Sequence, residues 1–127
     1  TKKHHLNVTF HGQTERSQIF AEMQSSHLGI MASAGFDTQG MTLVEAEAFG
    51  LPVIFCDPDM TEVVPPGGSV LTDGISPADF ANSIQDIIDH PGKITQMSET
   101  MLHHRPEIFM KNRIKKLITI YQSLIHQ

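Results

Sequence analysis

Asp37 and Glu45 are the two side chains whose type and position best suit chemistry. These acids stand eight positions apart, across the junction between a loop with two glycines and the predicted helix that follows it. In open α/β sheets, ligands bind beyond the carboxyl ends of the strands, where such loops lead into helix N-termini. We therefore interpret the stretch SAGFDTQGMTLVEAEAFG, residues 33–50, as the edge of a ligand site.

The predicted helix after Gly40 favours a ligand that carries phosphate. Its first backbone N–H groups are free and lie at the positive end of the helix dipole, and Gly40 lets the backbone approach a ligand closely. Thr42 and Glu45 are three positions apart and share a helix face, so both point towards the same occupant. Glu45 could accept hydrogen bonds from vicinal hydroxyls such as those of ribose, and Asp37 from sugar hydroxyls.

The elements that position this junction alternate along the chain. Short apolar or alternating runs predict strands at residues 6–11, 27–32, 52–56 and 69–72, and amphipathic stretches predict helices at 15–26, 41–49, 76–89, 93–104 and 110–126. Ser76, Pro77 and Asp79 form a capping-box pattern, and Gly50 suits the position after a helix end. This alternation indicates an α/β fold in a single domain, with a Rossmann-like parallel sheet of about four strands and flanking helices.

Residues 37–46 and 49–53, DTQGMTLVEA and FGLPV, resemble the donor-site signature of family 4 glycosyltransferases. In that signature an acid is followed, after seven residues, by Glu, a helix of small residues and a Gly-x-Pro-Val turn into a strand. The resemblance covers about residues 6–90 well and the C-terminal helices loosely. It implies a retaining, nucleotide-sugar-dependent enzyme of the two-domain GT-B fold, of which this chain would be the C-terminal, donor-binding part. The DTQG variant is most similar to bacterial enzymes that glucosylate lipids or cell-envelope polymers, which implies UDP-glucose or a similar donor.

The resemblance also implies roles for individual residues. Glu45 would bind the ribose hydroxyls, and Asp37 would be the catalytic-site acid near the hydroxyls of the transferred sugar. The backbone N–H groups of Gln39, Gly40 and Met41 would face the sugar and the phosphates. Thr42 would lie close to the phosphates. The first acid is usually Glu in the family, and Asp37 is one methylene shorter, so we expect its sugar contact through water or after loop closure.

Two parts of the family's machinery have no counterpart in this chain: an upstream basic pair that holds the diphosphate, and a first domain that binds the acceptor. We therefore expect a fragment that does not catalyse transfer alone and that works with a missing N-terminal domain of the same enzyme. Two strands of the family's sheet would be absent between residues 6–11 and 27–32. Strand 6–11 would then pair with strand 27–32, stay loosely attached or pair with another copy, because exposed sheet edges favour self-association.

The composition excludes several other classes of function. The net charge of −5 gives no support for coating nucleic acid. The single cysteine, Cys56, fits a reducing compartment, and no apolar run approaches the roughly 20 residues that a membrane span needs. We expect a cytoplasmic location. We expect no metal or other cofactor, because the adjacent pairs 4–5 and 103–104 are the main groupings of histidine and neighbours do not share a face.

Three features leave alternatives open at this stage. Residues 110–116 carry four basic side chains and no acid, which suits contact with anionic lipid at the inner face of a membrane; the simpler interpretation is the solvated outer face of a helix that packs on the core. Glu62 is either a helix-capping residue or a support of the donor loop, while Glu47 is taken as a solvated acid. The whole chain is alternatively a non-catalytic α/β module that binds a phosphorylated or nucleotide ligand.

Overall fold

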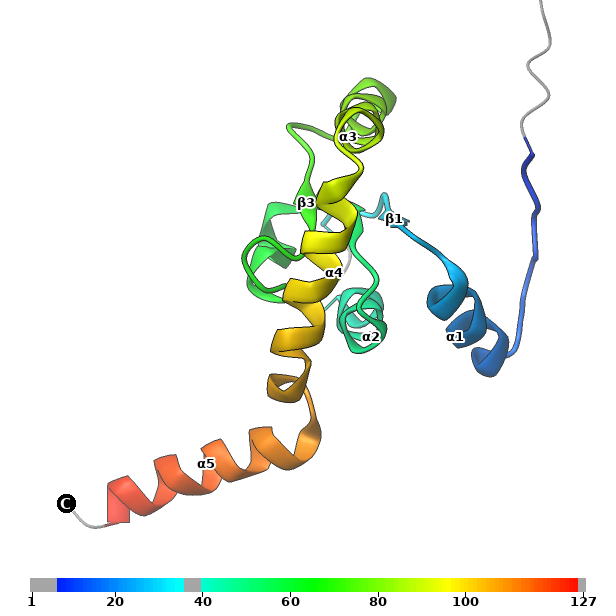
Figure 1. The fold of residues 1–127 in the computed structure, drawn as a ribbon. Coiled ribbons are helices and arrows are strands. Elements are labelled where there is room, and N and C mark those ends of the chain that lie inside the picture. Colours follow the sequence, from blue (N-terminus) through cyan, green and yellow to red (C-terminus); the bar gives the residue numbers. More distant parts are fainter. Residues whose placement is uncertain (1–6, 36–39, 126–127) are drawn as a thin grey trace, which may run out of the picture.

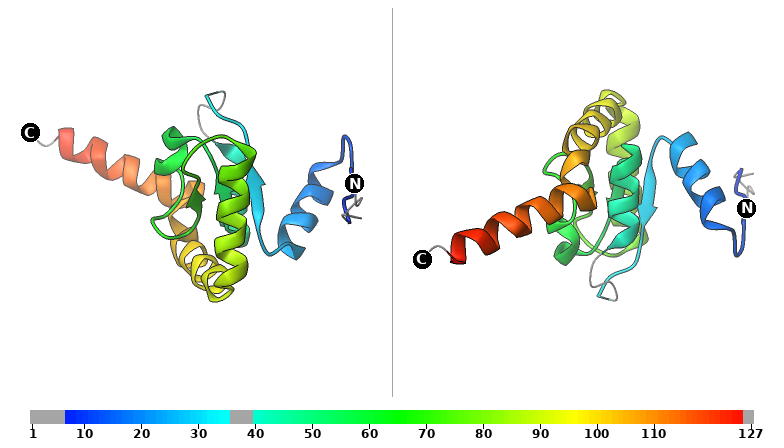
Figure 2. Two further views of the ribbon diagram at one scale, coloured as in Figure 1. Left: turned by 90° about the horizontal axis from the view of Figure 1, so that it is seen from above. Right: turned by 90° about the horizontal axis from the view of Figure 1, so that it is seen from below.

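The computed structural model describes residues 7–35 and 40–125. At its centre is a three-stranded parallel sheet in the order β1-β2-β3. Strand β2 pairs with β1 on one side and β3 on the other, with Gly29 opposite Val53 and Ile54 opposite Val70. Helices cover both faces of the sheet, as Figures 1 and 2 show, so the predicted Rossmann-like α/β architecture is confirmed.

Within residues 7–35 and 40–125 the sheet has three strands, whereas the sequence predicts about four. They are β1 (Gly29–Met31), β2 (Val53–Phe55) and β3 (Val70–Leu71). Residues 7–11 form no strand and are exposed throughout. A strand needs a neighbouring strand that takes its backbone hydrogen bonds, and residues 7–11 pair with no strand in the described part of the chain. Of the three arrangements considered for this segment, pairing with residues 27–32 is not found among the described residues, because Gly29–Met31 pairs only with Val53–Phe55.

The helices lie close to where the sequence predicts them. They are α1 (Arg16–Ser25), α2 (Met41–Phe49), α3 (Pro77–Asp89), α4 (Gly92–His104) and α5 (Met110–Ile125), with 3₁₀ turns η1 (Pro58–Glu62) and η2 (Arg105–Glu107). The capping box of α3 is confirmed: the Asp79 amide donates to the Ser76 hydroxyl, and the Ser76 amide donates to the Asp79 carboxylate. The Ser76 hydroxyl also donates to the Asp79 carboxylate, and this bond, followed by that from the Ser76 amide, holds the pKa of the carboxyl below the ordinary 3.8.

Two apolar clusters hold the layers together. The first joins one face of the sheet to α2 and η1, through Met31, Leu43, Ala46, Leu51, Val53, Phe55, Met60 and Val64. The second joins the other face to α3 and α4, through Ile54, Ile87 and Met97, with Val70, Phe80, Ile84 and Ile94 partly buried around them. Helix α2 packs on the sheet through Leu43 and Ala46, whereas Val44 and Ala48 are only half-buried.

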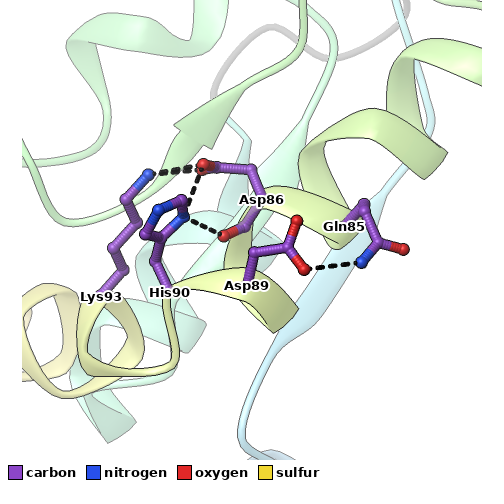
Figure 3. Close-up of polar contacts among 5 residues, drawn as sticks. All are labelled: Gln85, Asp86, Asp89, His90 and Lys93. Carbon is purple, nitrogen blue, oxygen red and sulfur yellow. Dashed lines mark hydrogen bonds and ion pairs between the residues drawn. The ribbon is translucent and has the colours of Figure 1, made fainter.

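A polar corner joins α3 to α4 (Figure 3). The Lys93 ammonium donates to both carboxylate oxygens of Asp86, at 2.8 and 2.6 Å, and the His90 Nδ1 atom lies 2.9 Å from the Asp86 carbonyl oxygen. The Gln85 amide donates to Asp89 one turn further along α3. Lys93 is the main reason why the pKa of Asp86 lies below its ordinary 3.8. All of these groups are exposed, so the corner sets the direction of α4 rather than forming a site for chemistry.

Helix α5 corrects the prediction that the C-terminal helix packs on the core. It leaves the domain after η2 and projects away from the sheet (Figures 1 and 2), and none of its described residues is buried. Its apolar side chains are 47–77% exposed, including Ile114 at 47% and Ile125 at 77%. In residues 7–35 and 40–125, no helix is long and apolar enough to cross a membrane.

Candidate functional site

The N-terminus of α2 lies at the carboxyl edge of the sheet, where the sequence predicts the ligand. Gly40 precedes the helix with φ +49° and ψ +47°, in the left-handed region that favours glycine. It is buried, and a Cβ atom placed there would lie 2.8 Å from the Met60 sulfur. The left-handed conformation therefore favours glycine at this position, and a larger residue would also have to displace the Met60 side chain.

The first turn of α2 has open hydrogen-bonding capacity. The Gly40 carbonyl accepts from the amides of Leu43 at 2.8 Å and Val44 at 3.3 Å, while no side chain caps the helix. Met41 is 53% exposed and Thr42 is also exposed, so the end of the helix faces solvent. A helix end of this kind is suited to an anion, because its N–H groups and dipole point the same way.

Glu45, the predicted ribose ligand, lies beside α1 and forms an ion pair with Arg16. The Glu45 side chain is 24% exposed and the Arg16 side chain 70% exposed. The Arg16 guanidinium also lies 5.1 Å from the centre of the Phe20 ring, and Phe20 contacts Phe49 of α2 with ring centres 5.3 Å apart. Without a ligand, the carboxylate of Glu45 is thus already occupied by a cation from α1.

The structure brings together only part of the predicted donor set. Gly40, Met41, Thr42 and Glu45 lie on the first turns of α2, with Thr42 and Glu45 on one side of the helix. Asp37 and Gln39 lie outside the described residues, so their predicted roles rest on the resemblance alone.

Asp57 is a residue at the edge of the site that the sequence analysis did not single out. It is 5% exposed and follows β2. Its Oδ2 atom accepts from the Gly35 amide at 2.7 Å, and its Oδ1 atom accepts from the Asp59 amide at 3.0 Å. It therefore ties the loop after β1 to the turn after β2. The sequence did contain a signal for this role: Asp57 and Pro58 follow a predicted buried strand, and an aspartate in that position commonly caps the next turn.

An open cleft of about 520 Å³ adjoins the other side of the α2 N-terminus. It is lined mainly by apolar side chains, among them Met41, Val44 and Ile108, with Glu62 and Arg113 as its charged members. Glu62 is exposed at the end of η1, and Asp57 caps that turn instead, so the capping role considered for Glu62 is not seen there. The cleft places a guanidinium from α5 near the helix end that faces solvent.

Glu47 contradicts the prediction of a solvated acid. It lies on the far side of α2 from Glu45, its side chain is fully buried, and His104 of α4 contacts it with Nδ1 2.6 Å from Oε1. Two acids that stand two positions apart on a helix point in different directions. Of these two acids, Glu45 therefore faces α1 and Glu47 faces α4.

Within residues 7–35 and 40–125, no group of three or more His, Cys, Asp or Glu side chains is arranged to hold a metal ion. Cys56 is 3% exposed, and its thiol donates to the Ser33 carbonyl at 3.6 Å.

The domain is Rossmann-like: it has a parallel sheet, and a helix that follows Gly40 and has no side-chain cap begins at the carboxyl edge of that sheet. Domains of this class bind ligands at that edge. Residues 1–90 match the family model described as "Glycosyl transferases group 1", and the chain therefore belongs to that family. It is also 30% identical over 91 residues to D-inositol 3-phosphate glycosyltransferase 1 of Catenulispora acidiphila, a match that covers 70% of this chain and 22% of that protein. The D-inositol 3-phosphate glycosyltransferase of Thermobifida fusca is 30% identical over 90 residues, which cover 69% of this chain and 21% of the relative.

Proposed function

We propose that the chain is the C-terminal, donor-binding part of a two-domain GT-B glycosyltransferase. The intact enzyme would move a sugar from a nucleotide-diphosphate sugar, UDP-glucose or a similar donor, to a lipid, polymer or other cell-envelope acceptor, with retention at the sugar carbon. Family membership supports the transfer of a sugar. The matched region spans only 22% of the first relative, so the acceptor site and the cations for the leaving diphosphate would come from residues outside this chain.

The observation that carries the proposal is the state of the α2 N-terminus. Gly40 is held in a left-handed conformation, the first turn has no side-chain cap, and Met41 and Thr42 are exposed beside it. Donor phosphates would occupy this helix end, where amides and the dipole favour negative charge. Glu45 would accept the ribose hydroxyls one turn further on, and Asp37 and Gln39 would meet the transferred sugar from the loop.

The Arg16–Glu45 ion pair means that ribose would compete with Arg16 for the Glu45 carboxylate. The ribose hydroxyls must either displace Arg16 or share Glu45 with it, because the guanidinium already occupies the carboxylate. Arg16 is 70% exposed, and exposed ion pairs contribute little free energy, so displacement is inexpensive. Arg16→Ala should therefore leave donor affinity unchanged or raise it slightly.

Calorimetry with UDP-glucose tests the role of Glu45. The protein should be extended to the length of its relatives, so that contacts from the remainder of the enzyme are present. Glu45→Ala should weaken binding by about 10–100-fold, since hydrogen bonds to a charged group contribute about 1.5–3 kcal/mol. Glu22→Ala, which removes an exposed acid from α1, is the matched control and should bind as the unaltered protein does. Equal affinity for Glu45→Ala and the unaltered protein would show that the ribose role is wrong.

The second candidate is a non-catalytic α/β module that binds a phosphorylated or nucleotide ligand. The open helix end beside an apolar cleft favours it, because such an arrangement binds phosphate without any acceptor site. Turnover separates the two candidates. An extended protein that hydrolyses or transfers sugar from UDP-glucose supports the enzyme, whereas binding of the nucleotide alone, with no turnover in the presence of envelope lipids, supports the module.

We also propose that the enzyme is cytoplasmic and works at the inner face of the membrane, with no metal or other cofactor. Support for the location comes from α5, where an exposed apolar face lies next to Lys111 and Lys115. Basic amphipathic helices of this kind bind anionic lipid surfaces. Sedimentation with vesicles that contain anionic lipid checks the location, and sedimentation with neutral vesicles serves as the control.

A further inference from the structure

Glu47 is the one described residue with a fully buried side-chain oxygen that lacks a hydrogen-bond partner, and the mechanism proposed above makes no use of it. Its Oε1 atom contacts His104 Nδ1 at 2.6 Å, while its Oε2 atom is buried without a partner in the described part of the chain. The His104 side chain is 42% exposed, so the histidine reaches solvent although the acid does not. A buried carboxylate is costly unless it is paired and hydrogen-bonded, and His104 is the partner that the structure gives to Glu47.

Further contacts hold the same half of α2 against α4 and η2. The Arg105 guanidinium donates to the Ala48 carbonyl at 3.5 Å. Leu102 packs so closely against Gly50 that a Cβ atom there would lie 2.6 Å from the Leu102 Cγ atom. The C-terminal half of α2 is therefore fixed by α4 and η2, while its N-terminal turn faces solvent without a cap.

The charged surroundings of His104 come from η2 and α5. A pocket of about 330 Å³ is lined by His104, Glu107, Arg113 and Lys116 together with two apolar residues of α5. Lys116 forms an ion pair with Glu107 and lowers the pKa of that carboxyl below 4.5. Glu107 is thus paired with Lys116, and the carboxylate that His104 contacts is that of Glu47.

We infer that Glu47 and His104 are a positioning pair: their contact sets how α2 is seated and so where its donor-binding end lies. The inference rests on the proposed function. Glu45 and Glu47 are on one short, rigid helix, and Glu47 is anchored on the side opposite to the predicted ribose ligand. Rotation or sliding of α2 by a fraction of a turn would unseat Glu47 and displace Gly40, Thr42 and Glu45 together. Because the direction of a charged hydrogen bond is fixed, the pair specifies the seating more strictly than apolar contacts do.

Substitutions that separate positioning from stability test this inference. Glu47→Gln keeps the shape of the side chain and removes its charge. Glu47→Met with His104→Leu replaces the pair by apolar side chains of similar size, an exchange that is often neutral or stabilising in other proteins. Glu99→Gln removes an exposed acid from α4 and serves as the matched control. Each variant is measured by thermal melting, by UDP-glucose titration of the extended protein and by amide hydrogen exchange of residues 41–49.

Positioning predicts that the double variant melts at or above the temperature of the unaltered protein, yet binds UDP-glucose about tenfold more weakly or worse, as misplaced binding groups do. Its α2 amides should also exchange faster, and Glu47→Gln should show the same loss of affinity. A double variant with unaltered affinity and unaltered exchange in α2 would overturn the inference. If the unaltered protein binds no nucleotide sugar, the proposed function fails separately, and the exchange of residues 41–49 in the double variant still decides the positioning role.

Discussion

Gly50→Ala should destabilise the protein for two reasons that can be measured apart. Gly50 follows α2 with φ +66°, and its amide and that of Leu51 bond back to the Glu47 and Ala46 carbonyls, both at 2.9 Å, which closes the helix. An alanine in this left-handed conformation costs about 1–2 kcal/mol. Its Cβ atom would also lie 2.6–3.2 Å from three atoms of Leu102, and overpacking of this kind costs typically about 1–3 kcal/mol. Together these costs predict a loss of roughly 2–5 kcal/mol.

Urea denaturation followed by circular dichroism measures this loss, and two other glycines supply controls. Gly67 also has positive φ, +80°, but open space around it, so Gly67→Ala reports the backbone cost alone. Gly92 begins α4 in open space with no positive φ, so Gly92→Ala should be neutral or stabilising. A cycle of Gly50→Ala and Leu102→Ala should show about 1–3 kcal/mol of relief in the double variant.

Two results would refute this reasoning. The first is a loss below about 1 kcal/mol for Gly50→Ala, since the left-handed conformation alone predicts more. The second is additivity of Gly50→Ala and Leu102→Ala, which would show that α4 does not press against the end of α2. In that case the seating of α2 against α4, on which the positioning role of Glu47 also depends, would need revision.

Three further predictions concern the scaffold. Ile87→Ala should cost about 2–5 kcal/mol in urea denaturation because Ile87 is 3% exposed, whereas Ile88→Ala, at 63% exposed, should change stability little; similar losses for both would contradict the assigned core. Ser76→Ala should cost about 1 kcal/mol through the lost cap of α3. Because folding lowers the pKa of Asp79, the ionised carboxylate contributes to the free energy of unfolding fully above pH 3.8, and this contribution should be lost as the pH falls through the lower native pKa. If the stability of Ser76→Ala falls with acid in the same way as that of the unaltered protein, this reasoning is wrong. Removal of residues 110–127 should leave the urea midpoint of the remaining domain nearly unchanged, and a large drop would show that α5 is part of the core.

Local signals predicted the helix ends and the class of fold. Ser76 and Asp79 are three residues apart, and each hydrogen bond of the capping box joins one of them to the other, so the box can be predicted without tertiary information. Gly50 ends α2 for a similarly local reason. The alternation of strands with helices indicated a parallel sheet because parallel strands need crossover connections.

Contacts distant in sequence could not be predicted. The alternating pattern of residues 6–11 is typical of a strand, but a strand forms only beside a partner, and the pattern does not specify one. The amphipathic pattern of residues 110–125 predicts that the helix has an apolar face, but it does not predict which other segment, if any, packs against that face. Glu47 and Glu45 look alike in the sequence, and the partner that sets Glu47 apart, His104, lies 57 residues away.

The single thiol of the chain, Cys56, gives the protein an intrinsic reporter of motion at the proposed donor edge. It lies directly after β2, is 3% exposed and contacts the Ser33 carbonyl, which belongs to the segment that leads towards the ligand site. A thiol reagent can reach it only when that edge opens locally. The rate of labelling would therefore follow the opening of the donor edge without any engineered label. A ligand that binds the closed form would slow the labelling in proportion to its occupancy.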